Sequence, residues 1–225
     1  MTRAAHRTLE DRRDPDAEDL VEVHADIQGA SAPADHRYVL HSALKTQCCR
    51  RLTERGWQLR ALRDGVERAD KLDFDVPGAE PTLQMRVPKD DLDKILALTD
   101  APLRLGSHVL LVDEPIVRPI RPSNTLHCDL VLICNQNRAP QGYWPADLGA
   151  KVGARLGAWF ERCDFGLTFG DRQSFQIKGH DYYGHPLRIT SLTDEESVFL
   201  QRHGLGGRQS FGCGTFWPCE DGLEV

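Results

Sequence analysis

The sequence predicts an α+β protein built from two successive modules, each with the element order β-α-β-β-α-β. Three observations support this fold class. The same order of alternating and helical patterns occurs in both halves, a proline-rich segment separates the halves, and 40 % of the 225 residues are hydrophobic, which is enough for a packed core. This is the order of the split, ferredoxin-like arrangement, here in tandem.

The first half contains the six predicted elements of one module. Leu20–Ile27 alternates apolar and polar residues, as a half-buried strand does. Asp35 is the predicted N-cap of a helix that runs from His36 to about Thr53. The remaining predicted elements are short strands at 57–62, 72–76 and 81–87, a helix at 89–98 and a strand pair at 103–112.

The segment between the halves, 114–122, has three prolines in nine residues. Proline removes a backbone donor and blocks the preceding helical turn, so we expect an extended linker. We therefore predict an N-terminal domain at 19–113, a linker at 114–123 and a C-terminal domain at 124–219. Residues 1–18, which carry mixed charges, are a predicted disordered tail, and 220–225 form a second tail.

The second half repeats the pattern. An apolar strand is expected at 125–134, and Pro145 suits the start of a helix that ends near Cys163. Further strands are expected at 174–178 and 182–191. Thr193 is placed to cap a helix over 194–203, and 211–218 is the last predicted strand.

Composition excludes several classes of protein. No apolar run is long enough to span a bilayer and the charged N-terminus has no signal-peptide pattern, so we expect a cytoplasmic protein with no membrane partner. The seven cysteines include no C-x-x-C pair, so neither a metal site nor a cofactor is predicted. The net charge of −6 argues against tight, nonspecific binding of nucleic acid, although a local basic face would suffice for a specific partner.

The most informative segment is glycine-rich and lies at 203–217, between the last helix and the last strand. It has the sequence HGLGGRQSFGCGTFW. Glycine permits positive φ and close backbone approach, and successive exposed amides can bind an anion. The residues expected to bind a phosphate backbone are Gly204, Gly206, Gly207, Arg208, Gly212 and Gly214. A helix C-cap followed by a bulged turn is the simpler alternative.

The spacing of these glycines resembles the C-terminal signature of the RAMP proteins. Two further motifs narrow the resemblance to the CRISPR-associated repeat-processing endoribonucleases, in particular to a short branch of that family. They are Pro33–Tyr38, which opens the first predicted helix, and Phe175–Gly179, which precedes the last one. The order of the motifs agrees with the family from about residue 20 to 219.

The resemblance implies a function. It implies metal-independent cleavage of CRISPR repeat RNA, the pre-crRNA, to mature crRNA. The 2′-hydroxyl would attack the scissile phosphate and leave a 2′,3′-cyclic phosphate and a 5′-hydroxyl. Other subunits of a CRISPR effector complex are implied partners, beside the RNA itself.

The resemblance also implies catalytic residues. It places the catalytic histidine at His36, and histidine suits proton transfer near neutral pH. Apart from the resemblance, two readings stay open for each of two further residues: Tyr38 either positions the phosphate or belongs to the core, and Lys178 either stabilises the developing negative charge or is a solvated strand residue. His41 lies about 140° from His36 around a helix and is expected to be structural.

Other residues have weaker assignments. Arg172 and Arg188 are expected to extend the RNA-binding strip of Arg208, with scattered surface charge as the alternative, and the same role is considered for Arg118 and Arg121 in the linker. His180, His185 and His203 stay open as a second catalytic group.

Two other functions remain open on the sequence. A non-catalytic RAMP subunit that binds RNA within an effector complex would share the fold and the glycine-rich loop, because fold alone does not determine activity. An RNA-recognition-motif protein would instead stack bases on exposed aromatic side chains, for which Phe175, Phe211 and Phe216 are the candidates.

Overall fold

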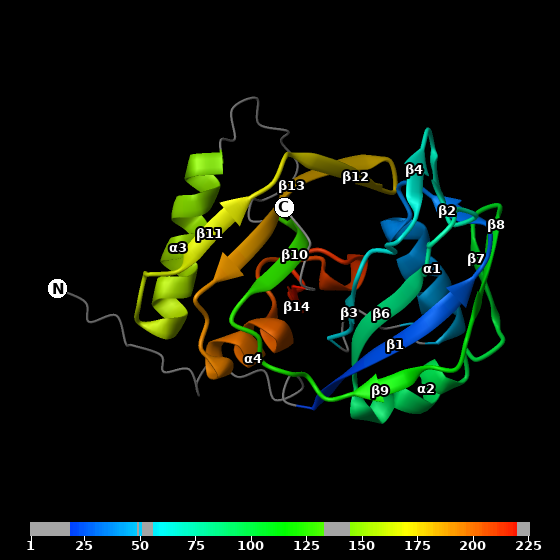
Figure 1. Cartoon of the computed structure of the whole chain (residues 1–225), viewed down its shortest axis with the longest axis horizontal. Helices are drawn as coiled ribbons and strands as arrows, with labels where there is room; N and C mark the ends of the chain where they lie inside the picture. The colour runs from blue at the N-terminus through cyan, green and yellow to red at the C-terminus, as the bar shows by residue number, and fades with distance from the viewer. Residues whose placement is uncertain (1–18, 49, 51–55, 133–144, 220–225) are drawn as a thin grey trace.

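The computed structural model describes residues 19–48, 50, 56–132 and 145–219, with the backbone alone at 145–147. Both predicted tails, and the predicted ends of elements at Thr53 and Cys134, lie outside the described residues. Within them, no helix is long and apolar enough to cross a membrane. Figure 1 shows the N-terminal and C-terminal halves side by side, with the C-terminal loop between them.

The N-terminal half follows the predicted element order. Its main elements are β1 (Leu20–Gln28), α1 (Arg37–Gln47), β3 (Gln58–Leu59), β6 (Thr82–Pro88), α2 (Leu92–Leu96) and β8 (His108–Val112). The 3-10 turn η3 (Lys89–Asp91) leads into α2, and β7 (Pro102–Leu105) forms a hairpin with β8. A side sheet consists of β2 (Ser31–Pro33), β5 (Lys71–Asp73) and β4 (Val66–Arg68).

The C-terminal half repeats this order. Its elements are β10 (Leu126–Val131), α3 (Pro145–Phe160), β11 (Gly166–Phe169), β13 (His180–Thr190), α4 (Asp194–His203) and β14 (Trp217–Pro218). One further strand, β12 (Gln173–Ile177), forms a hairpin with the first part of β13 and reaches toward the N-terminal half (Figure 1).

The two halves have the same sheet topology. The strand order is β3-β6-β1-β8 in the first sheet and β11-β13-β10-β14 in the second. If only these four strands of each half are numbered in chain order, both sheets have the strand order 2-3-1-4. Neighbouring strands in this order are antiparallel. The repeated order confirms the predicted pair of ferredoxin-like modules.

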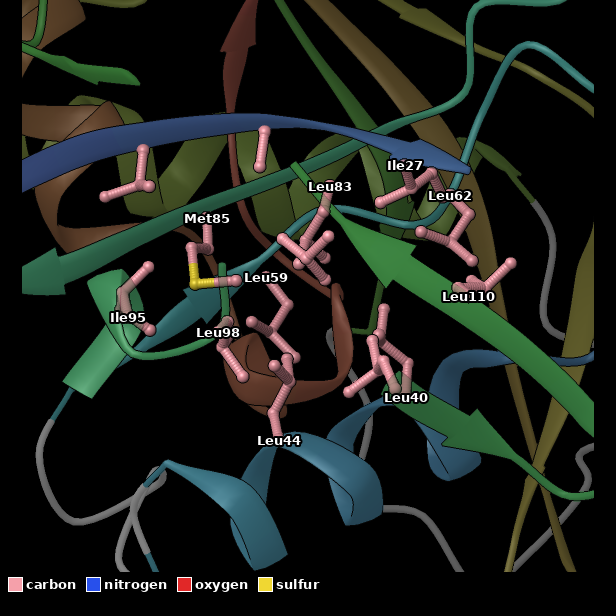
Figure 2. Close-up of a cluster of buried hydrophobic side chains, with 14 of the residues drawn as sticks. Ile27, Leu40, Leu44, Leu59, Leu62, Leu83, Met85, Ile95, Leu98 and Leu110 are labelled. Atoms are coloured by element: carbon pink, nitrogen blue, oxygen red, sulfur yellow. The ribbon is translucent and has the colours of Figure 1, made fainter. Parts of the chain in front are cut away.

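Each half buries its own apolar cluster. In the N-terminal half, α1 packs on the sheet through Leu40 and Leu44, which Figure 2 shows pointing toward Leu59 and Leu83. The C-terminal sheet is apolar on both faces. One face packs against α3 and α4, whereas the other carries Leu130, Phe175 and Tyr182 and receives the loop residue Phe211.

Of the two predicted helix N-caps, Thr193 is confirmed and Asp35 is wrong. Thr193 forms the predicted cap of α4, since its side chain accepts from the Glu196 amide while the Glu196 carboxylate accepts from the Thr193 amide. Asp35 does not cap α1. The N-cap is His36, and the Asp35 carboxylate accepts instead from the amide of Gln176 in β12, at 2.7 Å.

Two extended segments differ from their predictions. The proline-rich connection is extended, but its residues Ile116–Arg118 form a strand, β9, that pairs with β1. The predicted last strand at 211–218 is mostly wrong. It contains the end of a 3-10 turn, η4 (Gln209–Phe211), and a stretch of left-handed glycines, so that only Trp217–Pro218 pair as a strand.

A buried arginine joins the two halves. Arg86 of β6 is completely buried, and its guanidinium binds the Glu22 carboxylate at 2.9 Å. It also donates to the carbonyls of Gln201 and Phe216, at 3.0 and 2.7 Å, and lies 3.9 Å from the ring of Trp217. Burial lowers the pKa of Arg86 to about 10, against the opposing charge of Glu22, so the group stays protonated at neutral pH.

Replacing Arg86 should destabilise the whole chain. We expect Arg86→Ala to lower the free energy of unfolding by about 3–5 kcal/mol, because it leaves the largely buried Glu22 carboxylate with only His24 as a partner and removes the bonds to Gln201 and Phe216. Urea denaturation of the full chain measures this. Arg104→Ala, which removes an exposed arginine from β7, is the matched control and should change stability by at most about 0.5 kcal/mol. Equal effects of the two substitutions would contradict the role given to Arg86.

Candidate active site

Three segments from both halves enclose a cavity of about 510 Å³. They are α1, the hairpin of β12 and β13, and the C-terminal loop that follows α4. The residues that line the cavity are Tyr38, His41, Ser42, Lys45, Ile177, Lys178, His180, Tyr182, Arg208 and Phe211. The lining is therefore cationic and aromatic, and it includes three residues expected to act on RNA: Tyr38, Lys178 and Arg208.

Close backbone packing explains most of the glycines of the loop. Gly204, Gly206, Gly212 and Gly214 all have positive φ. A Cβ atom at Gly214 would lie 2.3 Å from the carbonyl oxygen of Leu205, and one at Gly206 would lie 2.4 Å from that of Leu132. Glycine is required where the chain folds this tightly upon itself.

The structure corrects the expectation that all five glycines bind phosphate. The amides of Gly204, Gly212 and Gly214 donate to the carbonyls of Leu200, Gln209 and Leu130, so these donors are already used inside the protein. The accessible part of the loop is its crest, where Gly206 is half-exposed and Gly207 and Arg208 are exposed. The crest is therefore the part of the loop that is open to a ligand.

Two polar contacts fix α1 against the C-terminal half. The Arg37 side chain donates to the carbonyl of Gly212 at 2.8 Å, and its guanidinium lies 6.0 Å from the ring of Phe175. On the other side, Asp35 holds the backbone of β12. The start of α1 is therefore clamped between the loop and the hairpin.

His36 lies inside the protein, which does not suit the catalytic role expected for it. The residue is 6 % exposed. Its Nε2 atom accepts from the amide of Leu62 at 2.8 Å, so Nδ1 carries the proton and donates to the carbonyls of Pro33 and Ala34. Because both ring nitrogens are engaged by backbone groups, His36 supports the start of α1 and does not face a substrate.

His41 is almost as buried, at 7 % exposed, but unlike His36 it lines the cavity. Its Nδ1 atom bonds to the carbonyl of Ser210 at 2.9 Å, and because a carbonyl only accepts, this nitrogen carries the proton. The ring stacks on Phe211 with centroids 3.9 Å apart. Burial lowers the pKa of His41, and the charges of Lys45 and Arg208 lower it further, while the bond to Ser210 opposes them.

A spacing within the sequence could have identified His41. Tyr38, His41 and Lys45 are separated by three and four residues, so they lie on one face of a helix. The prediction placed His41 only by its angle from His36, so it did not recognise the shared helix face of Tyr38, His41 and Lys45. It is the face that α1 turns toward the cavity.

Lys178 lies at the tip of the hairpin of β12 and β13. Ile177 pairs with His180, which leaves Lys178 and Gly179 as a two-residue turn. Both have positive φ, at 51° and 76°, which is the geometry of a type I′ turn. A lysine is unusual at positive φ, where asparagine or glycine is favoured. From this turn Lys178 lines the cavity.

Most of the other predicted residues do not line this cavity. Arg172 is exposed and lies over the ring of Tyr183, and Arg188 is half-buried six positions beyond Tyr182 on β13, roughly 20 Å along the strand. Among the open histidines, His180 lines the cavity, while His185 bonds to the carbonyl of Gly170 and His203 packs on Phe199. Arg172 and Arg188 are thus not brought together with Arg208.

The three aromatic candidates for base stacking are buried. Phe175, Phe211 and Phe216 are 3 %, 8 % and 0 % exposed, so they offer no open stacking platform. This is not the arrangement expected of an RNA-recognition-motif protein. In the described part of the chain, no group of three or more histidine, cysteine or carboxylate side chains is placed to hold a metal ion.

The fold and the cavity define a class of protein: tandem ferredoxin-like modules with a cationic and aromatic cavity beside a glycine-rich loop. Solved structures agree on the fold. A Cas6-related protein of Pyrococcus furiosus aligns with a TM-score of 0.62 at 12 % identity, covering 90 % of this chain and 99 % of its own. A RAMP protein described as binding different RNA substrates aligns with a TM-score of 0.61 at 12 % identity, covering 89 % and 100 %.

Sequence comparison identifies the family. Residues 21–221 match the family described as Cas6 Crispr. A curated relative, the CRISPR-associated endonuclease Cas6 of Myxococcus xanthus (strain DK1622), is 28 % identical over 199 residues, which are 88 % of this chain and 81 % of the relative. The chain belongs to the Cas6 family, and it is an endoribonuclease. This finding favours the enzyme over the non-catalytic RNA-binding subunit.

Two glycines of the loop offer a test of the packing argument. We expect Gly214→Ala to lower the free energy of unfolding by about 2 kcal/mol or more, because the new Cβ atom meets the Leu205 carbonyl at positive φ. Gly207→Ala is the matched control, since a Cβ atom there has open space around it. Thermal or urea unfolding measures both, and a Gly214→Ala protein as stable as the Gly207→Ala protein would refute the argument.

The burial of His36 predicts a pH dependence of stability. Burial, followed by the charge of Arg37, lowers the pKa of His36 from 6.5 to about 4. The folded state therefore holds the ring neutral, and this stabilisation is complete above pH 6.5 and is lost as the pH falls toward 4, by about 3 kcal/mol. Imidazole NMR should show a neutral Nδ1–H ring at pH 5.5, and in the variant His36→Gln the stability should fall less between pH 6.5 and 4. A ring that titrates near pH 6.5 would contradict the buried arrangement.

Proposed function

We propose that this protein cleaves CRISPR repeat RNA at the cavity between α1, the β12–β13 hairpin and the C-terminal loop, with His41 in the catalytic role. The single observation that carries the proposal is the convergence of His41, Lys178 and Arg208 on one cavity from three separate segments. Cleavage of RNA requires proton transfer and stabilisation of a negatively charged phosphoryl group. This cavity supplies residues for both.

The reaction is an attack of the ribose 2′-hydroxyl on the adjacent phosphorus. The bond between the 2′-oxygen and phosphorus forms, the bond to the 5′-oxygen breaks, and the products are a 2′,3′-cyclic phosphate and a 5′-hydroxyl. The 2′-hydroxyl loses one proton and the leaving 5′-oxygen gains one. His41 exchanges one of these protons through Nε2, because Nδ1 is held by Ser210.

The cationic side chains stabilise the charge that develops on the phosphoryl oxygens. Lys178 approaches from the hairpin, Lys45 from α1, and Arg208 from the crest of the loop. Donors fixed at the place where charge develops are among the largest contributions to catalysis. The Tyr38 hydroxyl, beside His41 on the same helix face, is placed to position the phosphate.

The proposed reaction needs no metal ion. Divalent cations such as Mg²⁺ prefer carboxylate oxygens. The residues that line the cavity carry ammonium, guanidinium, imidazole and phenol groups. These are suited to bind phosphate directly. Assembly with other subunits of a CRISPR effector complex remains a prediction from the family resemblance, and a cytoplasmic location remains a prediction from the sequence.

The reaction type can be tested with a modified RNA. Incubated in EDTA with the repeat RNA of its own array, the full chain should release fragments that end in a 2′,3′-cyclic phosphate and begin with a 5′-hydroxyl. A single 2′-deoxy substitution immediately upstream of the cut should abolish cleavage while the RNA still binds. Cleavage of the deoxy RNA, or cleavage that needs added metal ions, would overturn the proposed mechanism.

The assignment of His41 can be tested separately. His41→Gln should lower the single-turnover rate by about 10²–10⁴-fold, because the amide can still donate to Ser210 but cannot exchange a proton. His185→Gln, at a half-buried histidine on β13 that bonds to a backbone carbonyl outside the cavity, is the matched control and should keep the wild-type rate. If His41→Gln cuts as fast as wild type, another group performs the proton transfer.

A further inference from the structure

We propose that the turn η4 links phosphate binding at Arg208 to the charge state of His41, with Phe211 as the positioning residue between them. The inference rests on the proposed function and concerns the regulation of that same site. It starts from a feature that acid–base catalysis alone does not require. Arg208 is the N-cap of η4, and the two residues that contact the His41 ring, Ser210 and Phe211, lie in that same short turn.

The first step is that two residues of η4 fix the position of the His41 ring. The Ser210 carbonyl fixes the proton of His41 on Nδ1, and the Phe211 ring lies against the imidazole with an angle of 18° between their planes. Both contacts come from consecutive residues of η4. The orientation and the tautomer of His41 are thus set by the C-terminal loop, although His41 itself belongs to α1.

The second step is the position of Arg208 on the same turn. Its backbone has φ 69°, and its carbonyl accepts from the amides of Phe211 and Cys213. Its guanidinium lies 5.9 Å from the Phe211 ring and 5.3 Å from that of Tyr182, and it donates to the Tyr182 hydroxyl at 3.2 Å. Arg208 and His41 therefore both contact or approach Phe211.

The third step is electrostatic. The ionisable groups that face His41 come from every element around it: Tyr38 and Lys45 from α1, Lys178, His180 and Tyr182 from the hairpin, and Arg208 from the loop. Burial favours the neutral imidazole, and so do the positive charges of Lys45 and Arg208. A phosphate bound at Arg208 adds negative charge to this site and so favours the protonated ring.

The consequence is a reciprocal coupling. If phosphate binding favours protonated His41, protonation of His41 must favour phosphate binding by the same free energy. In the free protein, burial and the neighbouring charges favour the neutral form of His41. RNA bound at the crest of the loop shifts the ring toward its protonated form. The proton resides on Nε2, the nitrogen that the Ser210 carbonyl leaves available for the leaving 5′-oxygen.

The experiment follows the His41 ring by NMR in the full chain, free and bound to the non-cleavable 2′-deoxy repeat RNA. In wild type, the pKa of His41 should rise on RNA binding. In Arg208→Asn, which suits the left-handed backbone but removes the charge, the pKa in the free protein should already be higher and should rise less with RNA. Arg172→Asn, which removes an exposed arginine outside the cavity, is the control and should titrate as wild type does in the free protein.

Phe211 is tested by its own pair of variants. Phe211→Leu should leave the RNA affinity unchanged but lower the single-turnover rate roughly 10- to 10²-fold and displace its pH profile, since the ring that orients His41 is lost. Phe211→Tyr should restore both. A loss of rate with an unchanged pH profile, or no rescue by tyrosine, would mean that Phe211 only packs in the core and does not orient His41.

The results separate this inference from the proposed function. An equal pKa of His41 in free and RNA-bound wild type, an equal rise in wild type and Arg208→Asn, or no binding of the deoxy RNA would each overturn the coupling, whatever the cleavage assay shows. Conversely, a His41→Gln protein that still cuts RNA would remove the catalytic role of His41. The coupling measured by NMR would then still stand.

Discussion

The arrangement of the two halves depends on the buried guanidinium of Arg86. It binds Glu22 within its own half and the backbone of Gln201 and Phe216 in the other. These two backbone contacts lie on either side of the glycine-rich loop, at the end of α4 and before β14. Burial opposes the charge of Glu22, but the bonds from His24 and Arg86 outweigh it and lower the pKa of its carboxyl. One ion pair thus fixes both ends of the loop that carries Arg208.

The candidate active site belongs to neither half alone. The helix α1 packs its leucines into the N-terminal core, while its opposite face, with Tyr38 and His41, meets the loop and the hairpin of the C-terminal half. The tandem fold therefore does more than repeat a stable module. It places a helix of one copy where the loop of the other can orient its side chains.

The fold could be predicted from the sequence because local patterns determine it. The alternation of β1 and the capping residues of α4 are visible within a few positions, and the repeated element order gave both modules correctly. The site was harder to predict, because distant contacts decide which of the two buried histidines lines the cavity. His36 is buried because Leu62 and Pro33 engage its ring, and the glycines are explained by partners such as Leu132. None of these partners can be recognised from the neighbouring sequence.

The connection between the halves has a consequence for how RNA is admitted. Its strand β9 pairs with β1, the Arg121 carbonyl accepts from the Gln201 side chain, and the Ser123 amide bonds to Ser197 of α4. A connection held at so many points cannot act as a hinge. The cavity lined by His41 and Arg208 is accordingly already present in the free chain.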